Sequence, residues 1–446
     1  MSETTASEAG ATSTTTFRKK LGRPALRERK IVRLLQRLGP GLVTGGADDD
    51  PSGIATYSQA GAQFGFALNW TMLVTYPLMA AVQEISARVG RTTGKGIAGN
   101  IREHYPNWLL QWIVVLLLVA NTINIGADLG AMADAAALVV GGPRLLYVIC
   151  LGGFCATLQI LMSYRRYAAV LRWLTLSLLA YCGIFLVVKI PWGPLAASLL
   201  LPRFSWNASY WTMVVAIFGT TISPYPFFWQ ASQEVEEIRA VRERESLVKK
   251  PGQGPDAIDR IRLDTLFGMA FSNLVGLAIM IAAAATLHVN GLTQIGSAAE
   301  AAEALRPIVG PFAFAVFALG IIGTGLLAVP VLAGSAAYAL GEARRWPIGL
   351  ARQPTKAKAF YATIAVATMA GAAMNFLPFN PVRALVWSAV INGVVAVPVM
   401  AILMHMTSNP AIMGDYTIVG TLRIAGWMAT AAIGAAALGM IVSTLW

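Results

Sequence analysis

The chain has 446 residues, of which 56% are hydrophobic and 13% charged, with a formal net charge of +12 and a mean hydropathy of +0.60. Soluble globular chains carry about 25% charged residues, so this composition excludes an ordinary soluble domain and indicates a polytopic membrane protein. The basic residues lie between apolar runs, as the positive-inside rule expects, and this pattern argues against nucleic-acid binding.

The polar start of the chain precedes the first apolar run. Residues 1–16 are rich in Ser, Thr, Ala and Gly, a composition typical of disorder. The basic run from Arg18 to Arg37 is not followed by a short signal-type apolar core with a cleavage site. We therefore divide the chain into a cytoplasmic N-terminal segment, 1–37, and a transmembrane transporter domain, 38–446.

Apolar runs long enough to cross a bilayer occur eleven times in the transmembrane domain. They are 38–65, 67–88, 108–132, 145–163, 169–190, 209–232, 264–288, 309–340, 358–376, 384–406 and 421–445. Lys and Arg crowd alternate connections, whereas the connection 289–304 is nearly free of them. This asymmetry predicts a multi-pass protein of the cell membrane with a cytoplasmic N-terminus and, because the number of spans is odd, an extracytoplasmic Trp446.

The first apolar run contains the stretch Asp48-Asp49-Asp50-Pro51-Ser52-Gly53. Three consecutive carboxylates are costly at membrane depth, and a proline followed by a glycine breaks the hydrogen-bond ladder of a helix. Free carbonyls and carboxylates persist there only where they line a cavity or bind something. We predict that this break binds a divalent metal ion and that the chain moves the ion across the membrane.

The sixth run is interrupted as well, because Pro224 and Pro226 remove backbone donors within the stretch 219–226. Prolines kink many spans without a functional consequence. Breaks at the first and sixth positions, however, are typical of an inverted five-plus-five transporter repeat. The predicted fold class is therefore an all-α polytopic membrane protein with this repeat and an eleventh span outside it.

Several stretches resemble the NRAMP divalent-metal transporter family, and most closely its divergent branch that includes magnesium transporters. They are residues 39–41, 50–53, 59–65, 87–90, 93–95, 127–129 and 412–415. The resemblance implies a LeuT-like fold with a metal site between the broken first and sixth helices.

The metal-site motifs depart from the family pattern. Where the family has Asp-Pro-Gly-Asn, Asp50 and its proline match, but Gly53 stands at the position of the asparagine ligand. Where the family has Met-Pro-His, this chain has Ser223-Pro224-Tyr225. Loss of the thioether removes a filter against hard ions, and oxygen ligands suit Mg²⁺, Ca²⁺ and Mn²⁺. Gly53 is expected to open room for a partly hydrated ion, since Mg²⁺ sheds water reluctantly.

Positions at which the family pattern has titratable residues also differ in this chain. A further family histidine aligns with Gln230, and a family glutamate one turn after Asp128 is Ala131. Neither Tyr225 nor Gln230 titrates near neutral pH. Asp128 remains as a candidate for proton movement, or as the partner of a basic group from another helix, and Tyr225 is a candidate for gating or packing.

The predicted metal site has Asp50 as its anchoring carboxylate. Its other candidate members are carbonyls near Ala47 and Thr220, the Ser223 hydroxyl, Asp49 or Asp48, Gly53 by its position, and Gln230 through water. Alternatives remain for several of them. Asp50 could cap the broken helix, Asp48 and Asp49 point to other faces and could pair elsewhere, and the Ser223 hydroxyl could bond back to its own helix.

These features predict an importer of Mg²⁺ and/or Mn²⁺ that works by alternating access, with weak or no proton coupling. We expect a bilayer protein that functions as a monomer, with no enzymatic activity and no cofactor. One alternative is a proton-coupled Mn²⁺/Fe²⁺ transporter. Others are a non-transporting metal sensor and an organic-solute transporter of the same fold, although three aspartates would repel a substrate carboxylate.

Overall fold

The computed structural model describes residues 40–161, 182–187, 190–378 and 380–445. The N-terminal segment 1–37 lies outside these residues, as does most of the fifth predicted span, 169–190. The division of the chain at residue 37 and the existence of the fifth span therefore stay predictions.

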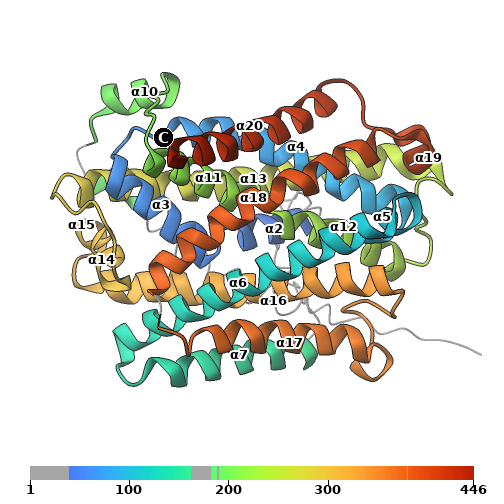
Figure 1. Cartoon of the computed structure of the whole chain (residues 1–446), viewed down its shortest axis with the longest axis horizontal. Coiled ribbons are helices and arrows are strands. Elements are labelled where there is room, and N and C mark those ends of the chain that lie inside the picture. Colours follow the sequence, from blue (N-terminus) through green and yellow to red (C-terminus); the bar gives the residue numbers. More distant parts are fainter. Residues whose placement is uncertain (1–39, 162–181, 188–189, 379, 446) are drawn as a thin grey trace, which may run out of the picture. The chain divides into compact units, whose positions relative to one another are not determined.

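The described residues form helices and connecting turns, with no strand among them (Figure 1). The α-helices are α2 (Pro40–Asp48), α3 (Pro51–Phe64), α4 (Trp70–Thr93), α5 (Ile97–His104), α6 (Asn107–Val140), α7 (Arg144–Leu161), α9 (Ile184–Val187), α10 (Trp192–Leu200), α11 (Ala208–Thr221), α12 (Pro224–Ala240), α13 (Gly254–Ala283), α14 (Ala298–Glu303), α15 (Arg306–Val309), α16 (Ala313–Arg344), α17 (Lys358–Met374), α18 (Pro381–Thr407), α19 (Pro410–Met413) and α20 (Gly420–Leu445). Short 3₁₀ or π turns are η2 (Pro251–Gln253), η3 (Ala284–His288), η4 (Gly310–Phe312), η5 (Pro354–Lys356) and η6 (Gly414–Tyr416).

Both predicted breaks are present. The first run divides into α2 and α3, with Asp50 in an extended conformation as the N-cap of α3 and Pro51 as its first residue. The sixth run divides into α11 and α12, where Ser223 is the extended N-cap and Pro224 begins the new helix. In each case the proline starts the second half because its missing N–H is unpaired at that position anyway.

Six helices in the described part of the chain are long and apolar enough to cross a membrane. They lie in the ranges Asn107–Val140, Arg144–Leu161, Pro251–His288, Gly310–Arg344, Pro381–Thr407 and Gly420–Leu445, and Lys358–Met374 is a shorter apolar helix. The halves of the two broken helices are too short to cross alone. The structure confirms an all-helical membrane protein with broken first and sixth helices, while the number of spans and their orientation stay predictions.

Glycines bring the broken helices into backbone contact with their neighbours. α2 packs against α13, and a Cβ atom added to Gly45 would lie 2.3 Å from the carbonyl oxygen of Gly268. α11 packs against α18, and a Cβ atom at Gly219 would lie 2.0 Å from the carbonyl oxygen of Ala389. Small residues permit such close approach between helices in a membrane. Each break is therefore anchored by one half-helix to a continuous helix.

Candidate metal site

Asp50 lies at the first break with its side chain buried. Its Oδ1 atom accepts hydrogen bonds from the Gly53 N–H at 2.7 Å and the Ser52 hydroxyl at 2.6 Å. Its Oδ2 atom accepts one from the Asn124 amide of α6 at 2.8 Å. Asp50 does cap α3, as one interpretation of the sequence expected. Capping and metal binding are compatible, because a carboxylate has about four lone-pair sites.

Asn124 is a site residue that the sequence analysis missed. Its amide also lies 3.3 Å from Asp128 Oδ2, and its oxygen accepts a 3.4 Å hydrogen bond from Asn392 of α18. The signal was present, because Asn124 lies four residues before Asp128 and therefore on the same face of a helix. Asp128 is fully buried, and no basic side chain of the described residues forms an ion pair with it. The basic partner considered for Asp128 is therefore not found in this part of the chain.

Asp48 and Asp49 face a different helix from Asp50. The Ser272 hydroxyl of α13 lies 3.0 Å from Asp49 Oδ1 and 3.3 Å from Asp48 Oδ2. Both carboxylates are buried. The three consecutive aspartates thus divide between α6 and α13, because the chain leaves α2 after Asp48 and is extended at Asp50, which turns the Asp50 side chain away from Ser272. Whether Asp49 contributes to a metal site stays a prediction.

The second break places its polar groups differently. The Ser223 hydroxyl donates to the carbonyl oxygens of Gly219 at 2.6 Å and Thr220 at 3.2 Å, both on the preceding helix. This is the local hydrogen bond that the sequence left open as an alternative. The hydroxyl oxygen keeps lone pairs, so its role as a ligand is untested.

One hydrogen bond joins the two breaks directly. The Tyr225 hydroxyl, in the first turn of α12, donates to the carbonyl oxygen of Ala47 at 2.9 Å. Ala47 is the penultimate residue of α2, so its carbonyl has no partner within that helix. Farther along α12, the Gln230 side-chain oxygen accepts a hydrogen bond from the Thr44 hydroxyl. Tyr225 and Gln230 therefore tie α12 to α2.

Gly53 does not leave the space that the sequence predicted. A Cβ atom at this position would lie 2.9 Å from the Thr220 hydroxyl and 3.4 Å from the carbonyl oxygen of Asp48. The room expected for a hydrated ion at Gly53 is thus occupied by the Thr220 side chain. The glycine instead allows α3 and α11 to approach each other where both helices are interrupted.

A comparison with protein families identifies the lineage of the chain. The sequence model of the family "Nramp: Natural resistance-associated macrophage protein-like" matches residues 41–443. The chain belongs to the NRAMP family.

Relatives of this NRAMP chain include two proteins named divalent metal cation transporter MntH. The one from Klebsiella pneumoniae strain 342 is 27% identical over 409 residues, covering 90% of this chain and 92% of the relative. The one from Verminephrobacter eiseniae is 28% identical over 409 residues, covering 87% and 85%.

Solved structures confirm the fold. A manganese transporter from Eremococcus coleocola superposes with a TM-score of 0.69 at 17% identity, covering 93% of this chain and 87% of that one. Mhp1, a nucleobase-cation-symport-1 family transporter, superposes with a TM-score of 0.58 at 14% identity, covering 92% of each chain. The predicted LeuT-like architecture is therefore confirmed.

The donor atoms near the breaks of this NRAMP chain are almost all oxygen. Among the described residues, no group of three or more His, Cys, Asp or Glu side chains is placed to hold a metal ion. The predicted site offers a cation the Asp50 carboxylate, with Asp49 as a further candidate, together with backbone carbonyls, hydroxyls, an amide oxygen or water. Such a set suits hard cations that keep part of their hydration shell.

Proposed function

We propose that this NRAMP chain imports divalent metal cations, Mn²⁺ and/or Mg²⁺, by alternating access. The observation that carries the proposal is the buried Asp50 carboxylate, held by Asn124 between two broken helices. An intramembrane carboxylate is expensive and is functional by default. The relatives named divalent metal cation transporter and the fold neighbour named manganese transporter support the same class of cargo.

The donor set favours hard ions. The predicted ligands are Asp50, the carbonyls of Ala47 and Thr220, and the Ser223 hydroxyl, with Asp49 and Gln230 as further candidates and Gly53 at the close approach of the two breaks. Ser223 stands where the resemblance expects a thioether, so the site lacks the soft ligand that would favour transition metals over Mg²⁺. Mg²⁺ binds with one or two carboxylates and several waters.

Weak or absent proton coupling is the second part of the proposal. Tyr225 and Gln230 occupy the histidine positions of the family pattern and do not titrate near neutral pH. The membrane potential alone drives a divalent cation inward with about 4.6 kcal/mol per 100 mV. The proposed orientation of the chain in the membrane, which follows from the distribution of Lys and Arg, places the N-terminus in the cytoplasm and Trp446 outside. The transporter is proposed to act as a monomer, without cofactor or enzymatic activity.

A proton-coupled Mn²⁺/Fe²⁺ transporter is the second candidate function. It is favoured by Asp128, a fully buried acid that shares the Asn124 amide with Asp50. A proton bound at Asp128 would therefore change the electrostatic potential at the proposed metal site. An organic anion as cargo is disfavoured by the three aspartates at the first break.

One uptake experiment separates these functions. The purified chain is placed in proteoliposomes that contain a pH-sensitive dye, at a clamped inward-negative potential, and Mn²⁺ uptake is followed with Mg²⁺ or Ca²⁺ as competitor. We expect Mn²⁺ uptake that millimolar Mg²⁺ inhibits, without matching acidification. Uptake that millimolar Mg²⁺ does not inhibit overturns the preference for hard ions and favours Mn²⁺/Fe²⁺ as cargo. Acidification that tracks metal uptake and disappears in Asp128→Asn establishes proton coupling. No uptake of any divalent ion refutes the transporter proposal.

A further inference from the structure

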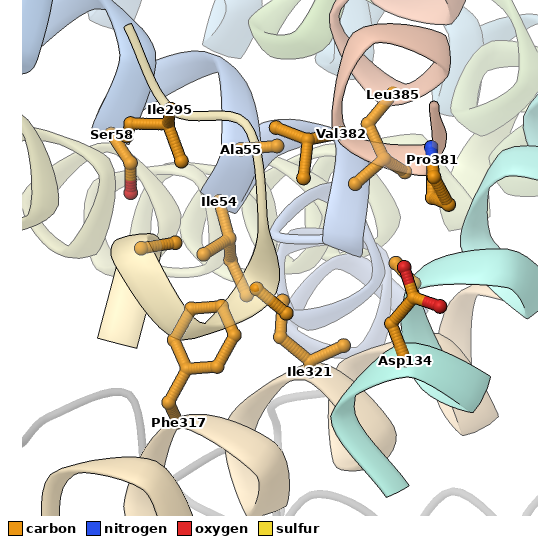
Figure 2. A pocket seen from close by; sticks show the side chains of 13 residues that line it. Ile54, Ala55, Ser58, Asp134, Ile295, Phe317, Ile321, Pro381, Val382 and Leu385 are labelled. Atoms are coloured by element: carbon orange, nitrogen blue, oxygen red, sulfur yellow. The ribbon is translucent and has the colours of Figure 1, made fainter. Parts of the chain in front are cut away.

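A small cavity lies beside the first break, lined by 13 described residues of α3, α6, α14, α16, α18 and the segment before α14 (Figure 2). Its volume is about 20 Å³, and a cavity needs roughly 10–15 Å³ on this measure to hold one water molecule. Most of the lining is apolar, for example Ile54, Phe317 and Leu385. The cavity therefore has room for about one water molecule by volume in this conformation and is too narrow for a fully hydrated ion.

The cavity begins one helical turn beyond Asp50 on α3. Ile54 and Ala55 line it, and the Ile54 N–H donates to the backbone carbonyl of Asp50. Ile295 and Pro381 line its other side, and they lie just before α14 and at the start of α18. These connections are poor in basic residues and are predicted to be extracytoplasmic. We call this cavity the outer vestibule, because it lies one helical turn from Asp50 on the side that is predicted to be extracytoplasmic.

Asp134 is the single charged residue among the described residues that line this vestibule. It lies on α6 six residues beyond Asp128, a rise of about 9 Å along the helix. Between them, Ala131 also lines the vestibule but offers no acid. Figure 2 shows the Asp134 carboxylate on the side of Pro381 and Leu385, whereas Ser58 lies on the other side of Ile54.

A guanidinium from the next helix neutralises this carboxylate. Arg144, the first residue of α7, lies with its Nε atom 2.7 Å from Asp134 Oδ1. Arg144 also donates to the side-chain oxygen of Asn375 at 2.7 Å, so a second acceptor holds it. The side chains of Asp134 and Arg144 are 24% and 27% exposed. Both side chains of the ion pair are therefore partly exposed.

We propose that Asp134 is an outer docking carboxylate for the incoming hydrated divalent cation, and that Arg144 is the counter-charge which the cation displaces. This inference rests on the proposed function. Asp134 lines the vestibule and Arg144 does not, so the low-dielectric walls focus the field of the carboxylate more than that of the guanidinium. A doubly charged ion is attracted by the carboxylate more strongly than a singly charged guanidinium at the same distance. Asn375 retains Arg144 while the pair is open, so the pair closes again after the ion has moved on.

Initial rates of Mn²⁺ uptake test the proposal through a separation of KM from the maximal rate. Asp134→Asn is compared with wild type, with the conservative Asp134→Glu, and with the control Glu303→Gln. Glu303 forms a 2.9 Å ion pair with Arg306 on a neighbouring connection and does not line the vestibule. We expect Asp134→Asn to raise the KM by about three- to tenfold at low ionic strength, with a smaller increase at high salt. Its maximal rate should stay within about twofold of wild type, because docking precedes the transport step. Asp134→Glu should restore most of the affinity.

A purely structural role of the ion pair gives a different pattern. It would lower the amount of folded protein and the maximal rate while leaving the KM and its salt dependence unchanged. The double variant Asp134→Asn/Arg144→Gln removes both charges, and it should still show a KM above that of wild type, because the docking carboxylate is absent. Uptake by wild type together with an unchanged KM in Asp134→Asn and in the double variant overturns the docking role. Absence of uptake in wild type overturns the proposed function instead.

Discussion

The two helix breaks share a geometry and differ in how they use their polar groups. At the first break, Asp50 receives hydrogen bonds from its own helix and from Asn124 on α6. At the second break, the Ser223 hydroxyl donates back to the helix that precedes it. The Tyr225 hydroxyl, also at the second break, donates to the Ala47 carbonyl of the first. The first break therefore carries the negative charge and receives hydrogen bonds from other helices. The second break supplies neutral groups, one of which donates to a backbone carbonyl of the first.

This difference separates anchoring from positioning. A cation needs a fixed negative charge, and Asp50 is fixed by donors from two helices. The oxygens of the second break contribute dipoles, which bind a hard ion only if they lie at the right distance. Substitutions at the first break should therefore abolish transport, while those that loosen the second break should reduce it by modest factors.

The largest effect is expected for Asp50→Ala, which removes the anchoring charge. Loss of an outer-shell partner costs about 10- to 100-fold in metal affinity, so loss of the anchoring ligand should reduce Mn²⁺ uptake by more than about 100-fold. The same change removes a helix cap, which costs about 1 kcal/mol of stability. Asn207→Ala is the matched control, because Asn207 caps α11 through a 2.7 Å hydrogen bond from the Tyr210 N–H. Undiminished uptake by Asp50→Ala would remove Asp50 from the site.

An intermediate effect is expected for Asn124→Ala. This change leaves Asp50 Oδ2 without its donor from α6, and a hydrogen bond to a charged group is worth about 1.5–3 kcal/mol. The uptake rate at subsaturating Mn²⁺ should fall by roughly 10- to 100-fold. Asn121→Ala serves for comparison, since Asn121 lies one turn away and donates to Leu332 and Ser335 of α16. Equal losses in the two variants would mean that helix packing, and not the Asp50 contact, explains the defect.

The smallest effect is expected for Tyr225→Phe, which removes the hydrogen bond between the breaks and keeps the ring. A neutral hydrogen bond contributes about 1 kcal/mol net, so uptake should fall by about fivefold. The measurement is the same initial rate of Mn²⁺ uptake. Tyr76→Phe is a suitable control, because its hydroxyl makes a 3.4 Å hydrogen bond to the Leu266 carbonyl away from both breaks. A loss as large as that of Asp50→Ala would mean that the second break is as important for uptake as the first.

The fold could be predicted because its signals are local. Eleven apolar runs, two of which break before a proline, predict an all-helical membrane protein without any knowledge of tertiary contacts. The positions of Asp50 and Ser223 as N-caps follow from the prolines that come after them. The positions of the two breaks, in the first and sixth runs, indicated the inverted repeat, and the family resemblance added the expectation of a metal site between them.

The partners of the site residues depend on helices far apart in the sequence. Asn124 reaches Asp50 across 74 positions, and Tyr225 reaches Ala47 across 178. No local pattern shows that Ser272 of α13 takes up Asp49, or that Thr220 fills the space beside Gly53. The predicted room at Gly53 was wrong for this reason.

What the sequence determined by itself is where the backbone must break and where a buried charge must be, because proline, glycine and aspartate act on their own segment. Only the tertiary structure decided which way each polar group points. A buried polar group takes the nearest donor or acceptor that helix packing provides. Asp50 and Asp49, adjacent in the chain, therefore bind to α6 and α13, respectively.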